Sequence, residues 1–309
     1  MNEIQSYQEI CPREEGNGFI CAPNAKYEDG SCITVGILKN MVETYNEEYP
    51  NNSINIDDSL EILNGHKFKQ ELVKQLENRL GSDQLKWIKE PFVNKMENIR
   101  KLKLKQYTFK PDGPQSKFEW LNQLHIDDVM KQYELKYPDF LFLGSVPIDF
   151  YEINYNDIAE IDIKKDLIDK GRTKIAMIIN LDTSKQPGSH WVSLYAHYDV
   201  NKHNDINNDP PKILIYFYDS YGMKPAKRIR KYMRLLARVA EKLNIKYIDL
   251  SYTKRQHQEE NSECGMYSLN FILRLLNGET FQEIESKRVP DAVVNECRTS
   301  YFKIKKMKN

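Results

Sequence analysis

The sequence of 309 residues lacks several features that would assign it quickly to a class of protein. It has no run of about 18 apolar residues, so we expect no membrane-spanning helix. Basic and acidic residues balance at 45 each, which gives a net charge of zero and no general attraction to nucleic acid or membranes. The first residues lack the apolar core of a secretory signal. The length suits one large domain or two small ones.

Cysteine is also scarce, with five residues at irregular spacing. An odd number without close pairs favours free thiols in a reducing intracellular compartment. Cys11, Cys21 and Cys32 lie near the N-terminus, but they are not spaced like zinc ligands, and His66 is the nearest histidine. We therefore expect no metal, three buried or half-buried thiols in a turn-rich segment, and a structural role for Cys297.

One stretch, residues 258–276, combines a polar start, a single cysteine and an apolar continuation. Its apolar residues cover almost every side of a helix, which is typical of a buried helix rather than an amphipathic one. Cys264 then lies at the first turn, where unpaired N–H groups and the helix dipole favour negative charge. This environment favours the thiolate, the nucleophilic form of cysteine. The pattern predicts a nucleophile that needs a base nearby.

A candidate base comes from three predicted strands, residues 174–181, 190–196 and 212–218. His190 begins the second strand, and Asp219 directly follows the third. If these strands pair in antiparallel fashion, the start of one lies beside the end of the other. An aspartate that orients a histidine, which in turn deprotonates a cysteine, is the arrangement of a catalytic triad.

Other residues compete for these two roles. For the acid, Asp199 is the runner-up, but it ends the strand that His190 begins and should lie at the far edge of the sheet. His197 is seven residues further along that strand, so its side chain points to the other face. None of the remaining histidines begins a strand beside a carboxylate: these are His66, His125, His203 and His257.

Four pieces in this order resemble the ubiquitin-like-protein-specific (SUMO) cysteine proteases: His190-Trp191, Tyr218-Asp219-Ser220, Gln258 and Cys264-Gly265. The same order occurs in adenovirus-type proteinases and in core-protein proteases of large DNA viruses. The resemblance covers residues 115–305. It implies an α+β, papain-like-clan fold with a central mixed or antiparallel sheet flanked by helices, and no cofactor. The family usually has aspartate before the cysteine, whereas this chain has Glu263, which puts only local capping in doubt.

The resemblance also implies roles for individual residues. Gln258, with the backbone N–H of Cys264, would donate to the oxyanion of acyl transfer. Gln256, two positions earlier, is the alternative donor. Trp120, in a Trp-Leu-Asn motif, would line the substrate groove, and its alternative is a core or staple tryptophan. The substrate-binding residues that we expect are Trp120, Trp191 and Gly265.

Residues 1–112 are predicted as a mostly helical arm region, and residues 113–309 as the protease core. The arm shows no chemistry, and docking of a partner or simple packing are equally open roles for it. Its boundary lies in 107–116, where two prolines and a glycine interrupt regular structure. Helices are predicted in the arm over 33–45, 68–80 and 83–104, the last interrupted near Pro91. In the core, helices are predicted over 123–137, 158–169, 225–243 and 281–302, and further strands over 140–148 and 245–252.

The predicted helix 225–243 has a basic face. A solvated face is the favoured interpretation, because exposed charges need no further reason. A site for nucleic acid or an acidic partner is the alternative. The basic residues at this helix are Lys224, Lys227, Arg228, Arg230, Lys231, Arg234 and Arg238.

The resemblance implies an endopeptidase that cleaves at or next to glycine, because grooves in this family are narrow. Its use is either maturation of viral structural polyproteins or processing of ubiquitin-like modifiers such as SUMO, NEDD8 or ubiquitin. Residues 11–13, 16–23, 120–122 and 288–291 look more like the viral branch, which favours maturation in the host cytoplasm, a virus factory or the virion. Two other classes stay open: a non-catalytic binding module, and an acyltransferase, which typically has glutamate in place of Asp219.

Overall fold

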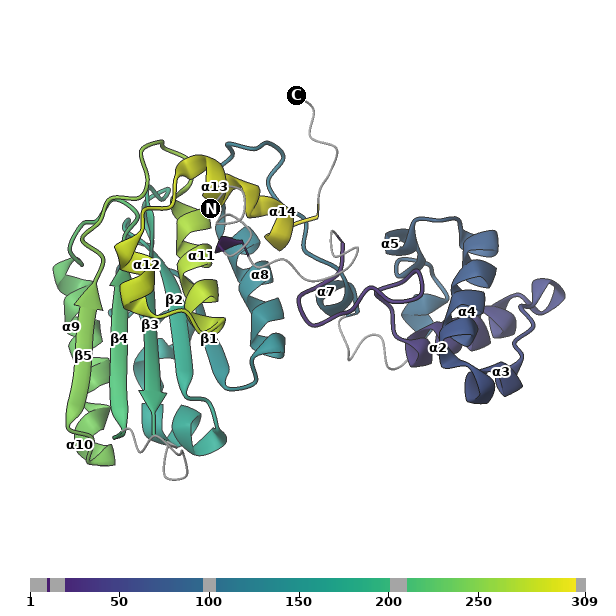
Figure 1. The fold of residues 1–309 in the computed structure, drawn as a ribbon, viewed down its shortest axis with the longest axis horizontal. Helices are drawn as coiled ribbons and strands as arrows, with labels where there is room; N and C mark the ends of the chain where they lie inside the picture. The colour runs from purple at the N-terminus through teal and green to yellow at the C-terminus, as the bar shows by residue number, and fades with distance from the viewer. Residues whose placement is uncertain (1–9, 12–19, 97–103, 201–209, 304–309) are drawn as a thin grey trace. The chain divides into compact units, whose positions relative to one another are not determined.

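The computed structural model describes residues 10–11, 20–96, 104–200 and 210–303 (Figure 1). By its internal contacts the chain divides into two compact units. We call them the core unit, which holds residues 10–11 and 113–301, and the arm unit, which holds residues 20–96, 104–112 and 302–303 of the described chain. The domain boundary after residue 112 that we proposed from the sequence stays a proposal. The two units differ from it near the ends of the chain, because residues 10–11 belong to the core unit and residues 302–303 to the arm unit.

The core unit is built on a five-stranded sheet in the order β1-β2-β3-β4-β5. The three central strands are antiparallel, and each edge strand is parallel to its neighbour, so the predicted sheet is confirmed as a mixed one. Each predicted apolar run forms one strand. The strands are β1 (Phe140–Pro147), β2 (Lys174–Asn180), β3 (Trp191–Asp199), β4 (Lys212–Tyr218) and β5 (Tyr247–Tyr252).

The register of β3 and β4 decides which residues meet at each edge of the sheet. Ser193 pairs with Tyr218, and Asp199 pairs with Lys212. The start of β3 therefore lies beside the end of β4, as the antiparallel prediction required. Asp199, the alternative acid, lies at the opposite end of the pair.

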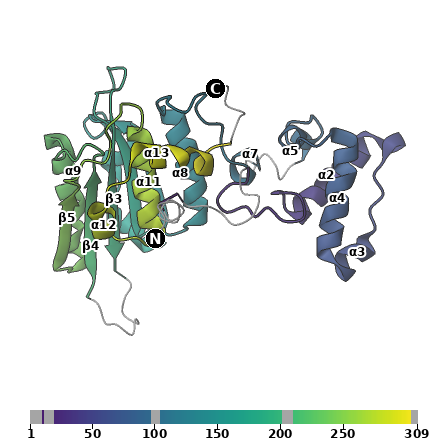
Figure 2. The same cartoon turned by 45° about the horizontal axis from the view of Figure 1, so that its top comes forward.

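Helices cover both faces of this sheet (Figures 1 and 2). On one face, α9 (Lys227–Ala237) and α10 (Val239–Leu243) pack on alternate strand residues such as Met177 and Ile215. On the other face lies α11 (Cys264–Leu276), beside α8 (Gln123–Lys136). All 13 residues of α11 are buried, which confirms the prediction of a buried helix.

Several predicted core helices are shorter in the structure than in the prediction. Residues 225–243 form two helices that meet at Arg238. The C-terminal stretch forms three, not one or two: α12 (Phe281–Ser286), α13 (Asp291–Glu296) and α14 (Arg298–Tyr301). The short acidic helix becomes single turns: η3 (Tyr155–Glu160), η4 (Ile163–Leu167) and η5 (Ile168–Lys170).

The arm unit is helical, as predicted. The first two predicted helices are α2 (Val35–Glu48) and α4 (Gly65–Leu80), and the third is interrupted near Pro91, as predicted. Pro91 cannot donate the backbone hydrogen bond, and it disfavours helix in the preceding residue. On either side of it lie α5 (Gln84–Trp87) and η2 (Val93–Lys95), and residues 97–103 are outside the described chain. The elements that we did not predict are η1 (Pro50–Asn52), α3 (Asp58–Leu63) and α7 (Leu104–Thr108).

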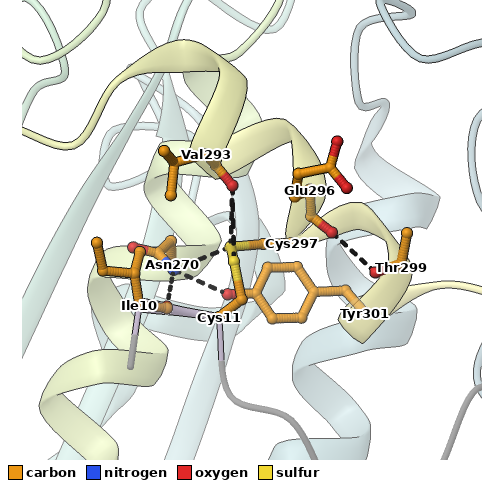
Figure 3. Close-up of a disulfide and its surroundings, with 8 residues drawn as sticks. All are labelled: Ile10, Cys11, Asn270, Val293, Glu296, Cys297, Thr299 and Tyr301. Atoms are coloured by element: carbon orange, nitrogen blue, oxygen red, sulfur yellow. Dashed lines mark hydrogen bonds between the residues drawn. A yellow bond between two sulfur atoms is a disulfide. The ribbon is translucent and has the colours of Figure 1, made fainter. Parts of the chain in front are cut away.

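Four of the five cysteines form disulfides, so the expectation of free thiols is wrong for them. Cys11 is bonded to Cys297 in the core unit, and Cys21 to Cys32 in the arm unit. Beside the first disulfide, the Asn270 amide donates to the carbonyl oxygen of Ile10 at 2.7 Å, which fastens the N-terminal residues to α11 (Figure 3). The cysteines therefore no longer support a reducing compartment, and the compartment stays a prediction.

Metal ions and membranes were expected to play no part. Within the described residues, no group of histidine, cysteine, aspartate and glutamate side chains is arranged to hold a metal ion. In that same part of the chain, no helix combines the length and apolar character needed to cross a bilayer.

Candidate active site

Cys264 is the first residue of α11 and the one free cysteine of the chain. It is almost fully buried, with 3% of its surface exposed. Glu263 precedes it, and its side chain does not cap the helix. The Glu263 carboxylate instead accepts hydrogen bonds from the backbone N–H of Ser262 and the amide of Asn295, each at 2.9 Å. The unusual glutamate therefore leaves the first-turn N–H groups free of a side-chain cap beside the thiol.

His190 and Asp219 meet at the edge of the sheet. His190 directly precedes β3 and Asp219 directly follows β4, and His190 Nε2 lies 2.9 Å from Asp219 Oδ1. The two side chains are 15% and 4% exposed. The backbone N–H of Tyr221 donates to the same Oδ1 at 2.9 Å. The same carboxylate oxygen thus contacts both the imidazole of His190 and the backbone N–H of Tyr221, which fixes its position.

The turn after β4 is locked against the segment that follows β5. The backbone N–H of Asp219 donates to Thr253 Oγ1 at 3.0 Å. Gly222 has a φ of +72°, and a Cβ there would lie 2.7 Å from the carbonyl oxygen of Lys254. Only glycine fits this position without displacing the backbone, because L-residues disfavour positive φ and the space is filled. Asp219 is thus carried on a rigid turn.

The surroundings of His190 favour its protonated form. Burial alone lowers its pKa, but hydrogen bonds to Asp219 and Cys264 and the negative charges of both outweigh burial and raise the pKa to about 9. Because Asp219 occupies Nε2, Nδ1 is the ring nitrogen that remains for the sulfur. A protonated imidazole beside a thiol stabilises the thiolate.

The other described histidines lack this arrangement. Burial, together with nearby lysine or arginine charges, lowers the pKa of both His197 and His257 to about 4, so both are neutral at neutral pH. His66 belongs to the arm unit, and His125 takes part in the N-terminal capping box of α8. His203 lies outside the described residues. His190 is therefore the best base among the histidines that the structure describes.

Gln258 is fully buried and tied to the turn that carries Asp219. Ser220 Oγ donates to Gln258 Oε1 at 2.7 Å, and Gln258 Nε2 donates to the carbonyl oxygen of Glu260 at 2.7 Å. One of the two amide hydrogens is thus accounted for. Gln256, the alternative, is exposed and donates to the carbonyl oxygen of Gln258. The contacts favour Gln258 over Gln256 as the residue connected to the site.

An open groove with a volume of about 410 Å³ is lined by Trp120, Leu121 and Trp191. Trp120 is 49% exposed, so it is not a core tryptophan. Trp191 Nε1 donates to the carbonyl oxygen of Leu121 at 2.9 Å and thereby fixes the groove wall. Both tryptophans that we predicted for substrate binding therefore line one groove.

Gly265 does not line this groove. A Cβ at this position would lie 2.9 Å from Cβ of Leu121, so the missing side chain makes room for Leu121 and not for substrate. A substrate contact of Gly265 stays a prediction. The glycine instead lets Leu121 pack directly on the first turn of α11, and the groove is lined by Ser189 and Trp191 on either side of His190 but not by Cys264 itself.

Sequence reasoning missed several residues that hold the site in place. Asp291 Oδ2 accepts the backbone N–H of Glu259 at 2.9 Å and of Glu260 at 3.2 Å, which fixes the loop after Gln258. Ser220 and Thr253 hold the Asp219 turn as described above. The signals were present in the sequence as the serine after Asp219 and as the Arg-Val-Pro-Asp stretch, but neither shows by itself which loop it contacts.

The seven basic residues at α9 are all exposed. One of them, Arg228, forms an ion pair with Glu152 at 3.0 Å. α9 covers the face of the sheet opposite α11, so the site does not use these charges. A nucleic-acid site here stays an untested prediction.

Comparisons with known proteins agree with this fold. Residues 151–307 match the Ulp1 protease family, C-terminal catalytic domain. A protein of Acanthamoeba polyphaga mimivirus that is named as a thiol protease is 33% identical over 296 residues, which cover 92% of this chain and 93% of that protein. A cysteine protease of African swine fever virus is 25% identical over 207 residues, or 63% of this chain and 72% of the relative. In another isolate of that virus, a relative that is 24% identical is named a SUMO-1 cysteine protease.

A solved structure shows the same fold. The crystal structure of the African swine fever virus protease superposes with a TM-score of 0.60 at 18% identity and covers 94% of this chain and 97% of that chain. Fold, family match and relatives together define the class of this protein, which is a cysteine protease. More particularly, the chain belongs to the Ulp1 protease family, and the predicted resemblance to its viral members is confirmed.

Proposed function

We propose that Cys264, His190 and Asp219 form the catalytic triad of a peptide hydrolase. The observation that carries this proposal is the 2.9 Å contact between a buried aspartate and a histidine whose pKa is raised by that aspartate and by the one free cysteine. Gln258 and the backbone N–H of Cys264 are the proposed oxyanion donors. Asp219 in the place of glutamate, and the family match, favour hydrolysis over acyl transfer.

The first half of the proposed reaction is acylation. The Cys264 thiolate attacks the carbonyl carbon of the scissile peptide bond, and the negative charge moves to the carbonyl oxygen. Preplaced donors lower the energy of this tetrahedral intermediate. His190 gives the proton on Nδ1 to the leaving amine while Asp219 holds Nε2–H. The C–N bond breaks, and a thioester remains on the sulfur.

The second half is deacylation. His190 Nδ1, now unprotonated, takes a proton from water as the water oxygen attacks the thioester carbon. The new tetrahedral intermediate collapses, the C–S bond breaks, and the carboxylic acid product leaves. The thiolate and the protonated His190 are restored, so the enzyme needs no cofactor.

The proposed substrate is a polypeptide with glycine at or next to the cleaved bond. This follows from the family resemblance and is supported by the groove, whose wall Leu121 is fixed between Trp191 and the start of α11. Because the relatives reported above are viral, we propose that the natural substrate is a viral structural polyprotein, cleaved in the host cytoplasm, a virus factory or the virion.

Processing of a ubiquitin-like modifier is the second candidate. It is favoured by the family name and by the name SUMO-1 cysteine protease that some of the African swine fever virus relatives carry. A folded modifier would need surface contacts beyond the groove, whereas a short polyprotein segment would not. A peptide library and intact modifier precursors therefore separate the two uses.

The decisive experiment maps cleavage sites in a peptide library by mass spectrometry. We expect cuts at or beside glycine with the parent chain. The variants Cys264→Ala and His190→Ala should show no cuts, and His66→Ala in the arm unit serves as the matched histidine control with parent activity. Cuts by either core variant would remove that residue from its role, and cuts without glycine would contradict the proposed specificity.

Rapid cleavage of modifier precursors, together with no cleavage of free Gly-containing peptides, would support the second candidate over polyprotein maturation. A chain that folds, binds such peptides and cleaves none would be a binding module.

A further inference from the structure

Arg298 is a buried arginine that the proposed reaction does not use. It is the first residue of α14 and is 2% exposed. Its Nε donates to Asn295 Oδ1 at 3.0 Å, and its Nη2 donates to the carbonyl oxygen of Glu119 at 3.0 Å. Glu119 directly precedes Trp120. The guanidinium thus connects α13 to the segment that forms the groove wall.

The same hydrogen-bond chain reaches the residue before the nucleophile. The Asn295 amide donates to Glu263 Oε1 at 2.9 Å while its own oxygen accepts from Arg298. Asn295 is 4% exposed and Glu263 is fully buried. An amide placed between a guanidinium and a carboxylate is polarised by both and strengthens both contacts. Arg298, Asn295 and Glu263 therefore form one buried chain that ends next to Cys264.

The charges in this chain explain why the arginine is there. A buried carboxylate beside Cys264 would by itself oppose a second negative charge on the sulfur. The charged groups that face Arg298 are Glu263, Glu119 and Cys264. Burial lowers the pKa of Arg298, and these three negative charges oppose that effect. Removing one partner of a buried charge pair leaves the other charge uncompensated.

Hydrogen bonding alone does not account for the arginine. Its Nη1 is buried and has no hydrogen-bond partner among the described residues. Buried polar groups nearly always have hydrogen-bond partners, so the hydrogen bonds of Arg298 do not explain why its whole guanidinium is buried here. A neutral side chain could fill the same space without a buried donor that lacks a partner. The property that distinguishes arginine at this position is therefore its positive charge.

We propose that Arg298 is a positioning residue that compensates Glu263 through Asn295 and thereby stabilises the thiolate of Cys264. Its contact with Glu119 holds the groove wall to the same chain. This inference rests on the proposed role of Cys264 as nucleophile.

The test measures the rate of Cys264 alkylation by iodoacetamide against pH, with mass spectrometry to read the modified cysteine. In Arg298→Met the pH midpoint of alkylation should move up by about one unit, and the rate at pH 6 should fall about tenfold, as for loss of a nearby opposite charge. Adding Glu263→Gln to Arg298→Met should bring the midpoint back. A purely structural arginine would not be rescued by loss of a second partner.

Arg274 supplies a matched control on the same helix as Cys264. It is 7% exposed and pairs with Glu279 at the other end of α11. Arg274→Met should lower stability without moving the midpoint. Arg298→Lys, which keeps the charge, should keep the midpoint within about half a unit, because a charge of the same sign remains in place.

The outcomes separate this inference from the proposed function. A reactive Cys264 whose midpoint is unchanged in Arg298→Met overturns the inference alone. A parent chain in which Cys264 is not alkylated overturns both. Should Arg298→Met not fold, Glu263→Gln alone decides: we expect its midpoint to fall, and an unchanged or higher midpoint overturns the inference.

Discussion

Among the described residues, one histidine–aspartate contact in each unit has the same length. In the core unit, His190 Nε2 lies 2.9 Å from Asp219, and the side chains are 15% and 4% exposed. In the arm unit, His66 Nδ1 lies 2.9 Å from Asp29, and the side chains are 79% and 13% exposed. Distance alone does not distinguish the pairs. Burial does, together with the free thiol that only the first histidine faces.

Two buried glutamines, one in each unit, also make similar contacts but differ in their proposed roles. Gln258 in the core and Gln84 in the arm each accept a hydrogen bond from a serine hydroxyl at 2.7 Å, and each donates to a backbone carbonyl oxygen at 2.7 Å. The arm glutamine fixes a loop that the Cys21–Cys32 disulfide also closes. The core glutamine fixes the turn of Asp219. The same local chemistry serves structure in one unit and, in our proposal, catalysis in the other.

The largest expected difference concerns the two aspartates. Asp219→Asn should lower kcat by about 10⁴-fold, because an amide holds the wrong imidazole tautomer. Asp29→Asn keeps the same chemistry of substitution at an exposed pair and should leave kcat unchanged. Steady-state kinetics on a Gly-containing peptide would measure both effects. Equal effects of the two substitutions would contradict the role of Asp219 as the acid that orients His190.

The two disulfides should differ next. In the chain-entropy account, closing a longer loop stabilises more, about 5 kcal/mol for Cys11–Cys297 and about 3 kcal/mol for Cys21–Cys32. The sequence separations are 286 and 11 residues. Guanidinium unfolding of the two double-serine variants would measure this. A larger loss of unfolding free energy from the arm disulfide would contradict the prediction.

The next largest difference is expected between the two buried glutamines. Gln258→Ala should lower kcat about 100- to 1000-fold, as for the loss of one oxyanion donor. Gln84→Ala should lower the free energy of unfolding by about 1–3 kcal/mol, because buried partners lose their hydrogen bonds, and should leave kcat unchanged. Kinetics and denaturant unfolding of both variants would show it. Gln256→Ala, with parent kcat expected, tests the neighbouring alternative.

The smallest effect is on pH dependence. The pKa of His190 in the folded chain, about 9, lies above its usual value of 6.5, so folding favours the imidazolium. Its contribution to stability is complete below pH 6.5 and is lost as the pH rises through 9. The same titration should halve kcat/KM near pH 9. His66→Gln should leave this profile unchanged, and a profile flat to pH 10 would contradict the assignment.

Much of the core could be predicted because the strands and the buried helix each have an apolar pattern within their own residues. Residues 175–179 are all apolar, and the apolar residues of α11 cover almost every side of the helix, so each reveals its burial without any knowledge of its neighbours. The order of β3 and β4 then placed His190 beside Asp219. These inferences needed only periodicity and antiparallel pairing.

What could not be predicted depends on contacts between residues distant in sequence. Cys11 and Cys297 are too far apart for spacing to reveal their bond. Arg298 looks like any charge in a short C-terminal helix until Asn295 and Glu263 are seen beside it. Nor does the sequence show that Leu121 fills the space beside Gly265. Local patterns give elements and their burial, but not which partners meet.

The most direct test is a crystal structure of the chain with a peptide aldehyde that ends in glycine. The account predicts a bond from Cys264 sulfur to the aldehyde carbon, His190 Nδ1 within hydrogen-bonding distance of the adduct, and the new oxygen facing Gln258 Nε2 and the Cys264 N–H. An adduct on another residue, or an oxygen turned away from Gln258 with His190 out of reach, would contradict it.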